Sequence, residues 1–159
     1  MDFRSMARSI HVERGIEGAP KSLLALDPGH TTGWGYFETT NLVTCGQIDT
    51  TSIEVAAPAI GDLLQQYHPE VIVLEDYRIY RWKQKEHVGS DMLTTRVIGC
   101  IETLSLSHFT PVFKQSAQVA KNFCTDKKLK NWGFWQEGQK HARDAIRHGC
   151  YFIIFGPNK

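Results

Sequence analysis

The sequence predicts an α/β fold with a five-stranded mixed sheet flanked by helices. Residues 23–26 are an apolar run that ends at the carboxylate Asp27, and residues 70–76 repeat this pattern up to Glu75. Short apolar runs of this kind are typical of strands buried on both faces. A stretch with helical spacing lies between them, and a strand–helix–strand order implies a right-handed crossover between parallel strands. We therefore expect both carboxylates at the same end of one sheet.

The other elements follow from local patterns in the sequence. Pro28 and Gly29 indicate a tight turn, after which Gly33 and Gly35 should let a second strand return beside the first as a hairpin. Ser52 is a suitable N-cap for the first long helix, which the dipeptide at 68–69 should end. Together the patterns predict strands at 33–38, 41–49 and 109–113, helices at 51–67, 88–106 and 137–155, a helical turn at 116–123 and a cationic loop at 125–133.

Length and composition indicate one domain preceded by a leader. Residues 1–20 are mixed in charge and poor in periodicity, so we expect a flexible N-terminal arm, with residues 21–159 as a single domain. The four cysteines have no paired spacing, which fits neither a zinc site nor a disulfide framework. No apolar run approaches the roughly 20 residues of a membrane span. These features predict a soluble, cytoplasmic protein without a membrane partner.

Positive charge is concentrated in two segments. Residues 77–85 contain four cations and no acid, and residues 114–147 contain eight cations and three acids, although the net charge of the chain is only +1. The first segment interleaves Tyr77, Tyr80 and Trp82 with its cations, which suits stacking on bases and neutralising phosphates. One interpretation is a polyanionic partner, and the alternative is an ordinary solvated surface.

Carboxylates from three distant segments are expected to meet in one site. Glu75 rather than Asp76 should join Asp27, because neighbouring residues on a strand point to opposite faces. In the last helix, His141 and Asp144 are three residues apart and share one face. Clustered carboxylates repel one another unless they are protonated or hold cations, and hard oxygen ligands favour Mg²⁺ or Mn²⁺. Two such ions beside cationic segments point to phosphodiester hydrolysis in nucleic acid.

Three more basic residues follow in the same helix. Arg143 and Arg147 are expected to project away from the face of Asp144. His148 lies four residues after Asp144 on nearly the same side, and we interpret it as a structural histidine at the edge of the core. A solvated helix with an acid near its N-terminus is the alternative interpretation of this segment.

Taken together, these motifs resemble the RuvC-type Holliday junction resolvases, particularly their phage-encoded relatives. The resemblance covers about residues 22–155 and rests on Asp-Pro-Gly at 27–29, Thr-Gly-Trp-Gly at 32–35, the strand that ends in Glu75, and His-Ala-Arg-Asp-Ala at 141–145. It implies a ribonuclease H-like fold, a homodimer, two Mg²⁺ ions for which Mn²⁺ can substitute, and no nucleotide cofactor. The implied enzyme is a crossover junction endonuclease of DNA recombination and repair in a bacterium or a phage-infected cell. It would make paired incisions in four-way or other branched DNA and leave 5′-phosphate ends.

The resemblance also implies roles for individual residues. By position, Asp27, Glu75, His141 and Asp144 match the catalytic metal ligands of the family, whose third ligand is an acid in some members and a histidine in others. The loop after Glu75 corresponds to the region that places an aromatic side chain at the junction centre. The residues expected to bind DNA are Tyr77, Arg78, Tyr80, Arg81, Trp82, Lys83, Lys121, Lys127, Lys128 and Lys130.

Three other functions are compatible with parts of this pattern. A ribonuclease H-like nuclease acting on structured RNA would keep the fold and the site. A catalytically inactive junction-binding protein would keep the fold alone. An actin-like nucleotide-binding protein would need a second phosphate-binding hairpin and a longer chain, and the sequence contains neither.

Overall fold

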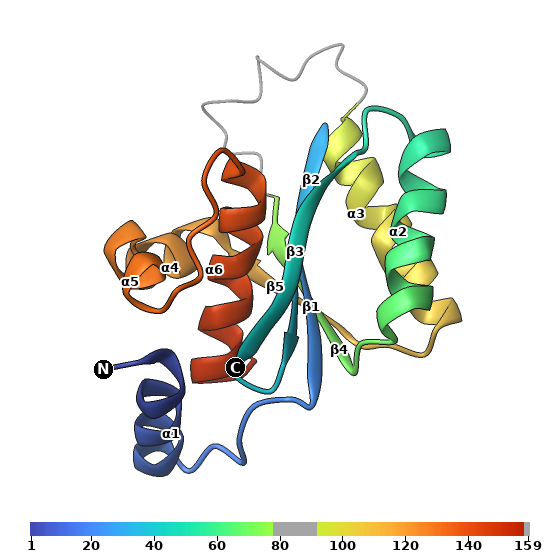
Figure 1. The fold of residues 1–159 in the computed structure, drawn as a ribbon. Coiled ribbons are helices and arrows are strands. Elements are labelled where there is room, and N and C mark those ends of the chain that lie inside the picture. The colour runs from blue at the N-terminus through green and yellow to red at the C-terminus, as the bar shows by residue number, and fades with distance from the viewer. Residues whose placement is uncertain (78–91, 158–159) are drawn as a thin grey trace, which may run out of the picture.

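The computed structural model describes residues 1–77 and 92–157, which form three layers (Figure 1). The middle layer is a five-stranded sheet in the order β3–β2–β1–β4–β5. Strand β1 pairs antiparallel with β2 and parallel with β4, and β4 pairs parallel with β5, so the predicted mixed sheet is confirmed. The strands are β1 (Ser22–Asp27), β2 (Thr31–Glu38), β3 (Asn41–Asp49), β4 (Val71–Asp76) and β5 (Val112–Ser116).

Helices cover both faces of this sheet (Figure 1). The helices α2 (Ile53–Tyr67) and α3 (Leu93–Ser107) pack on one face. The helix α6 (Lys140–Phe155) crosses the other face, with α4 (Ala117–Phe123) and α5 (Asp126–Asn131) beside it. The helix α1 (Phe3–Arg14) lies near the C-terminal end of α6. Within the described ranges, no helix is both long and apolar enough to span a membrane.

Alternate side chains of the central strands fill two separate cores. In β1, Leu26 packs toward α2 and α3, whereas Ala25 packs toward α6. Asp27 is two residues beyond Ala25 and therefore lies on the α6 side. The same period of two in β4 puts Glu75 on the side of Val73, which also belongs to the core under α6. The two carboxylates thus share one face and one end of the sheet.

The predicted elements after β4 differ from the structure at their boundaries. The strand expected at 109–113 starts at Val112, because residues 108–110 close the end of α3 with backbone bonds to Ser105 and Leu106. The loop expected at 125–133 contains α5, whose N-cap is Thr125 and whose Leu129 is buried. The last helix begins at Lys140, and residues 88–91 of the helix predicted at 88–106 lie outside the described residues.

The N-terminal segment is a packed helix rather than a free arm. Asp2 caps α1 by accepting a hydrogen bond from the Ser5 backbone N–H at 2.8 Å. Phe3 is buried, and its ring centroid lies 5.0 Å from that of Trp132 and 5.2 Å from that of Phe134. The expected flexible arm at 1–20 is therefore wrong for residues 3–14, whose apolar residues have the spacing of one helical face.

The glycines of β2 allow α6, rather than the neighbouring strand, to approach. A Cβ on Gly33 would lie 2.0 Å from the backbone carbonyl of His141, at the start of α6. A Cβ on Gly35 would lie 3.1 Å from Ile146, and one on Gly149 of α6 would lie 2.3 Å from the ring of Phe37. The predicted hairpin is confirmed, because β1 and β2 pair antiparallel, but it is α6 that occupies the space left at Gly33 and Gly35. The start of α6 is held directly on β2.

Gly33→Ala should destabilise the protein by about 2–3 kcal/mol, because its Cβ overlaps backbone atoms that cannot move independently. The matched control is Gly61→Ala in α2, where a Cβ would meet no atom within 4 Å. In that helix interior the same change should stabilise by about 0.5–1 kcal/mol. Urea unfolding of both variants measures the difference. A Gly33→Ala protein as stable as the Gly61→Ala protein would show that β2 and α6 are not in direct contact.

Candidate active site

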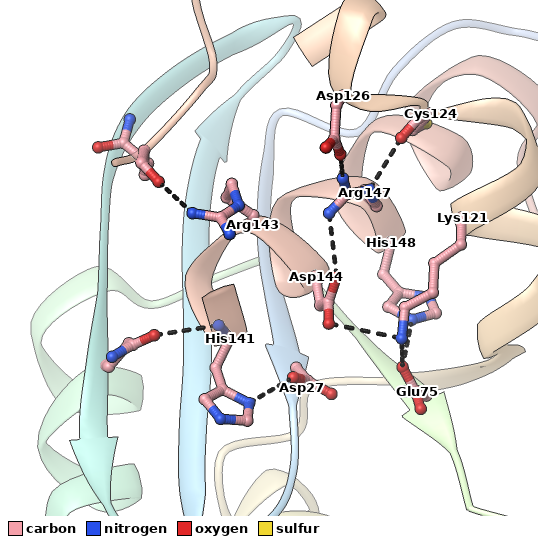
Figure 2. A network of polar contacts seen from close by, with 12 residues as sticks. Asp27, Glu75, Lys121, Cys124, Asp126, His141, Arg143, Asp144, Arg147 and His148 are labelled. Atoms are coloured by element: carbon pink, nitrogen blue, oxygen red, sulfur yellow. Dashed lines mark hydrogen bonds and ion pairs between the residues drawn. The ribbon is translucent and has the colours of Figure 1, made fainter. Parts of the chain in front are cut away.

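Three carboxylates lie at one end of the sheet (Figure 2). Asp27 ends β1, Glu75 is the next-to-last residue of β4, and Asp144 lies in the second turn of α6. Asp27 and Asp144 are buried. Burial, together with the negative charges of Glu75 and Asp144, raises the pKa of Asp27 to about 6, although a hydrogen bond with His141 opposes the shift. Asp27 is therefore close enough to the other two carboxylates to be repelled by their charges.

The start of α6 is held against the sheet by two neighbouring strands, β2 and β3. Gly33 leaves room for its first turn, and the side-chain carbonyl of Gln47 in β3 accepts a hydrogen bond of 3.0 Å from the His141 backbone N–H. This position turns the His141 ring toward Asp27, with Nδ1 3.1 Å from Oδ2 (Figure 2). The sequence-predicted pair of His141 and Asp144 is thus brought to Asp27 by contacts that no local pattern indicates.

Lys121 of α4 lies between two of the carboxylates. Its Nζ is 3.4 Å from Oδ2 of Asp144 and 3.9 Å from Oε2 of Glu75. The ammonium group offsets part of the negative charge at this end of the sheet. Lys121 was expected to bind DNA, and the structure places it at the centre of the candidate site.

Arg147 holds Asp144 from the opposite side, which corrects the prediction that it projects elsewhere. Its buried guanidinium donates from Nη1 to Oδ1 of Asp144 at 3.0 Å and from Nε to the carbonyl of Cys124 at 2.9 Å, and Nη2 pairs with Asp126. Residues three apart on a helix are neighbours, so the spacing of Arg147 and Asp144 was a usable signal. One side chain therefore joins α6 to the α4–α5 connection.

His148 holds Glu75 and is no edge residue. The imidazole is fully buried, with Nε2 3.1 Å from Oε2 of Glu75 and Nδ1 3.1 Å from the side-chain oxygen of Gln115. Burial raises the pKa of Glu75, whereas the hydrogen bond from His148 and the charges of His148 and Lys121 lower it. The lowering is the larger effect, so the net shift of the pKa is downward. Gln115 is the β5 partner of Glu75, and only this strand register brings it to the site.

The carboxylates are the chemical type of ligand that a hard divalent cation prefers. As the side chains stand, no three or more His, Cys, Asp or Glu groups among residues 1–77 and 92–157 are arranged to hold an ion, and each of the three carboxylates faces a basic side chain. The donors are nevertheless carboxylate oxygens, which Mg²⁺ and Mn²⁺ prefer. Burial, and then the negative charges of Glu75 and Asp144, raise the pKa of Asp27, and a bound cation would offset both effects.

Apart from Lys121, the residues expected to bind DNA fall into three groups. Lys127, Lys128 and Lys130 belong to α5, where the Lys128 ammonium lies 3.6 Å from the centroid of the Phe123 ring. Tyr77 is partly buried against the core under α2 and α3. The other members of the predicted set, Arg78, Tyr80, Arg81, Trp82 and Lys83, lie outside the described residues.

No protein-family model and no curated protein matches the chain. Solved structures do. Thermus thermophilus RuvC in complex with Holliday junction substrate has a TM-score of 0.66 at 14% identity, over 84% of this chain and 93% of that one. The yeast mitochondrial Holliday junction resolvase has a TM-score of 0.60 at 12% identity, over 94% of this chain and 85% of that one. The fowlpox virus Holliday junction resolvase has a TM-score of 0.54 at 15% identity, over 83% of this chain and 97% of that one. The chain has the RuvC-type resolvase fold. The expected ribonuclease H-like architecture is confirmed.

In this RuvC-type fold, the contribution of Asp27 to the stability of the metal-free protein should be lost as the pH rises from about 4 to 6. The pKa of Asp27 is raised from 3.8 to about 6 in the folded state, so folding favours its protonated form and this contribution disappears as the carboxylate ionises. Asp27→Asn should remove the loss and stabilise the protein at pH 8 by about 1–3 kcal/mol. The measurement is thermal unfolding in EDTA at several pH values. Equal pH dependence in wild type and variant would contradict the assignment.

Proposed function

We propose that this protein is a divalent-metal-dependent endonuclease that resolves four-way DNA junctions, and other branched DNA, by paired incisions that leave 5′-phosphate ends. The carrying observation is the meeting of Asp27, Glu75 and Asp144, from β1, β4 and α6, at one end of the sheet. Support also comes from the fold, because similar structures of Thermus thermophilus RuvC and the fowlpox virus resolvase contain Holliday junction DNA.

The proposed ion ligands are Asp27, Glu75, His141 and Asp144, which would hold two Mg²⁺ or Mn²⁺ ions. Bound ions of this kind activate water and stabilise a leaving oxygen at phosphorus. Arg147 fixes one oxygen of Asp144 and His148 one oxygen of Glu75, so the chain orients both carboxylates before an ion binds. This preorganisation supports a catalytic rather than a structural role for the cluster.

Lys121 has a second role in this proposal. In the metal-free protein its ammonium group neutralises Glu75 and Asp144. Ions that bind these carboxylates would take over this role and leave the half-exposed ammonium group available for a DNA phosphate. The lysines of α5 would extend the same basic surface, and a homodimer would supply the two active sites that paired incisions require.

Cleavage of a synthetic mobile four-way junction tests the proposal. Each strand carries a label, and the reactions contain Mg²⁺, Mn²⁺, Ca²⁺ or EDTA. We expect Mg²⁺-dependent, symmetrically paired cuts whose products a DNA ligase can reseal, which requires 5′-phosphate and 3′-hydroxyl ends. A structured RNA is assayed in parallel. Cleavage of the RNA alone would favour the ribonuclease alternative, and tight junction binding without cleavage in Mg²⁺ or Mn²⁺ would favour a junction-binding protein.

A further inference from the structure

A groove of about 520 Å³ lies beside the carboxylates, between the first two turns of α6 and the α4–α5 connection. Its volume is within the range of sites for small ligands, about 300–1,000 Å³, and it is open to solvent on one side. Asp144 lines both this groove and the carboxylate cluster. The charged residues that line the groove are the cations Lys121, Lys140, Arg143 and Arg147 and the acids Asp126 and Asp144.

Two of the four cations are already neutralised. Lys121 faces Asp144 and Glu75, and Arg147 is paired with Asp144 and Asp126. The other two, Lys140 and Arg143, form no ion pair with any residue that the structure describes. They are three residues apart on α6, where like charges repel each other. An anion between them would relieve this repulsion.

Arg143 is oriented before any ligand arrives. Its Nη1 donates a hydrogen bond of 2.7 Å to the backbone carbonyl of Gln136, and its guanidinium carbon lies 4.3 Å from the centroid of the Trp135 ring (Figure 2 shows the hydrogen bond). The guanidinium therefore has little conformational entropy left to lose on binding, and its remaining N–H groups suit the oxygens of a phosphate.

We propose that this groove binds a second phosphodiester of the DNA strand, next to the one cleaved at the carboxylates, and that Arg143 and Lys140 recognise it. This inference rests on the proposed function. Arg143 is the chain neighbour of Asp144, and Lys140 precedes Asp144 by four residues, about 6 Å along the helix axis. A strand whose cleaved phosphate lies at the carboxylates therefore has its adjoining phosphates within reach of the groove.

The first test is binding of a four-way junction by the full-length, metal-free protein at several salt concentrations. Arg143→Ala and Lys140→Ala should each weaken binding about tenfold and lower the slope of log K against log salt by about one. The matched control is Arg8→Ala on the exposed side of α1, which should leave both quantities unchanged. Arg143→Lys should recover the slope and only part of the affinity. Thermal unfolding checks that each variant is folded.

The second test locates the phosphate. Single neutral methylphosphonates are placed along the strand on both sides of the cleaved position. Wild type should lose affinity at a position next to the cleaved phosphate, and Arg143→Ala should be insensitive at that position alone. Identical maps for wild type and Arg143→Ala, or an Arg143→Ala protein that behaves as Arg8→Ala, would overturn the inference. Millimolar inorganic phosphate that competes at Arg143 without any position effect would assign the groove to free phosphate instead and overturn it too.

The two proposals fail in different ways. A wild-type protein that binds junctions but never cuts them contradicts the proposed nuclease, whatever the variants do. A wild-type protein that cuts junctions, with Arg143 and Lys140 variants that bind as tightly as Arg8→Ala, contradicts only the second phosphate site. Absence of any DNA binding by wild type contradicts both.

Discussion

Asp144→Asn should slow Mg²⁺-dependent cleavage of a four-way junction by at least about 10³-fold, which corresponds to about 4 kcal/mol of transition-state stabilisation. The variant removes the negative charge that an ion needs, but its amide oxygen can still accept the hydrogen bond from Arg147. Helix α6 should therefore keep its position. Affinity for the junction in EDTA should change by less than about threefold, because the hydrogen bond from Arg147 that positions this part of α6 is kept.

The control for Asp144→Asn is Asp126→Asn, the same change at the other carboxylate that Arg147 contacts. Asp126 is not a proposed ion ligand, so cleavage should remain within about threefold of wild type. Initial rates and Kd values are measured for both variants on one junction. Loss of binding with retained cleavage in Asp144→Asn would contradict the assignment, as would equal rates for the two variants.

Arg147→Ala should lower the free energy of unfolding by about 3–5 kcal/mol, the largest loss that we expect from any single substitution in the site. Its guanidinium is buried, and removing it leaves the buried carboxylate of Asp144 and the carbonyl of Cys124 without this donor. Lys121 would then be the remaining cation beside the buried carboxylate, at 3.4 Å, and removing one partner of a buried pair is far more costly than losing a surface pair. Urea unfolding in EDTA measures the effect.

Two further variants make this prediction specific. Asp126→Asn should cost less than about 1 kcal/mol, because the Asp126 side chain is 63% exposed and water can replace the pairing. The double variant Arg147→Ala/Asp144→Asn should recover part of the loss, since the buried side chain at position 144 is then neutral. An Arg147→Ala protein that unfolds at the same urea concentration as Asp126→Asn would show that the guanidinium does not hold the site together.

The arrangement of Asp27 and Glu75 could be predicted from the sequence because it depends on the two-residue periodicity of side chains along a strand. Two apolar runs separated by a helical stretch predict parallel strands, and the period of two selects Glu75 over Asp76 for the face of Asp27. The helical period similarly puts His141 and Asp144 on one face of α6. Helix α1 shows the limit of the same reasoning, because its apolar spacing was present but its partners, Trp132 and Phe134, lie more than a hundred residues away.

The sequence by itself determined the fold class, the end and face of the sheet where Asp27 and Glu75 lie, and the helix that carries Asp144. Only the tertiary structure decided which basic side chains face these carboxylates: Lys121 between Glu75 and Asp144, Arg147 behind Asp144, and His148 against Glu75. The physical reason is that periodicity assigns a residue to a face, whereas a contact between faces depends on how distant elements dock. Here that docking depends on backbone approach at Gly33 and on the pairing of β4 with β5.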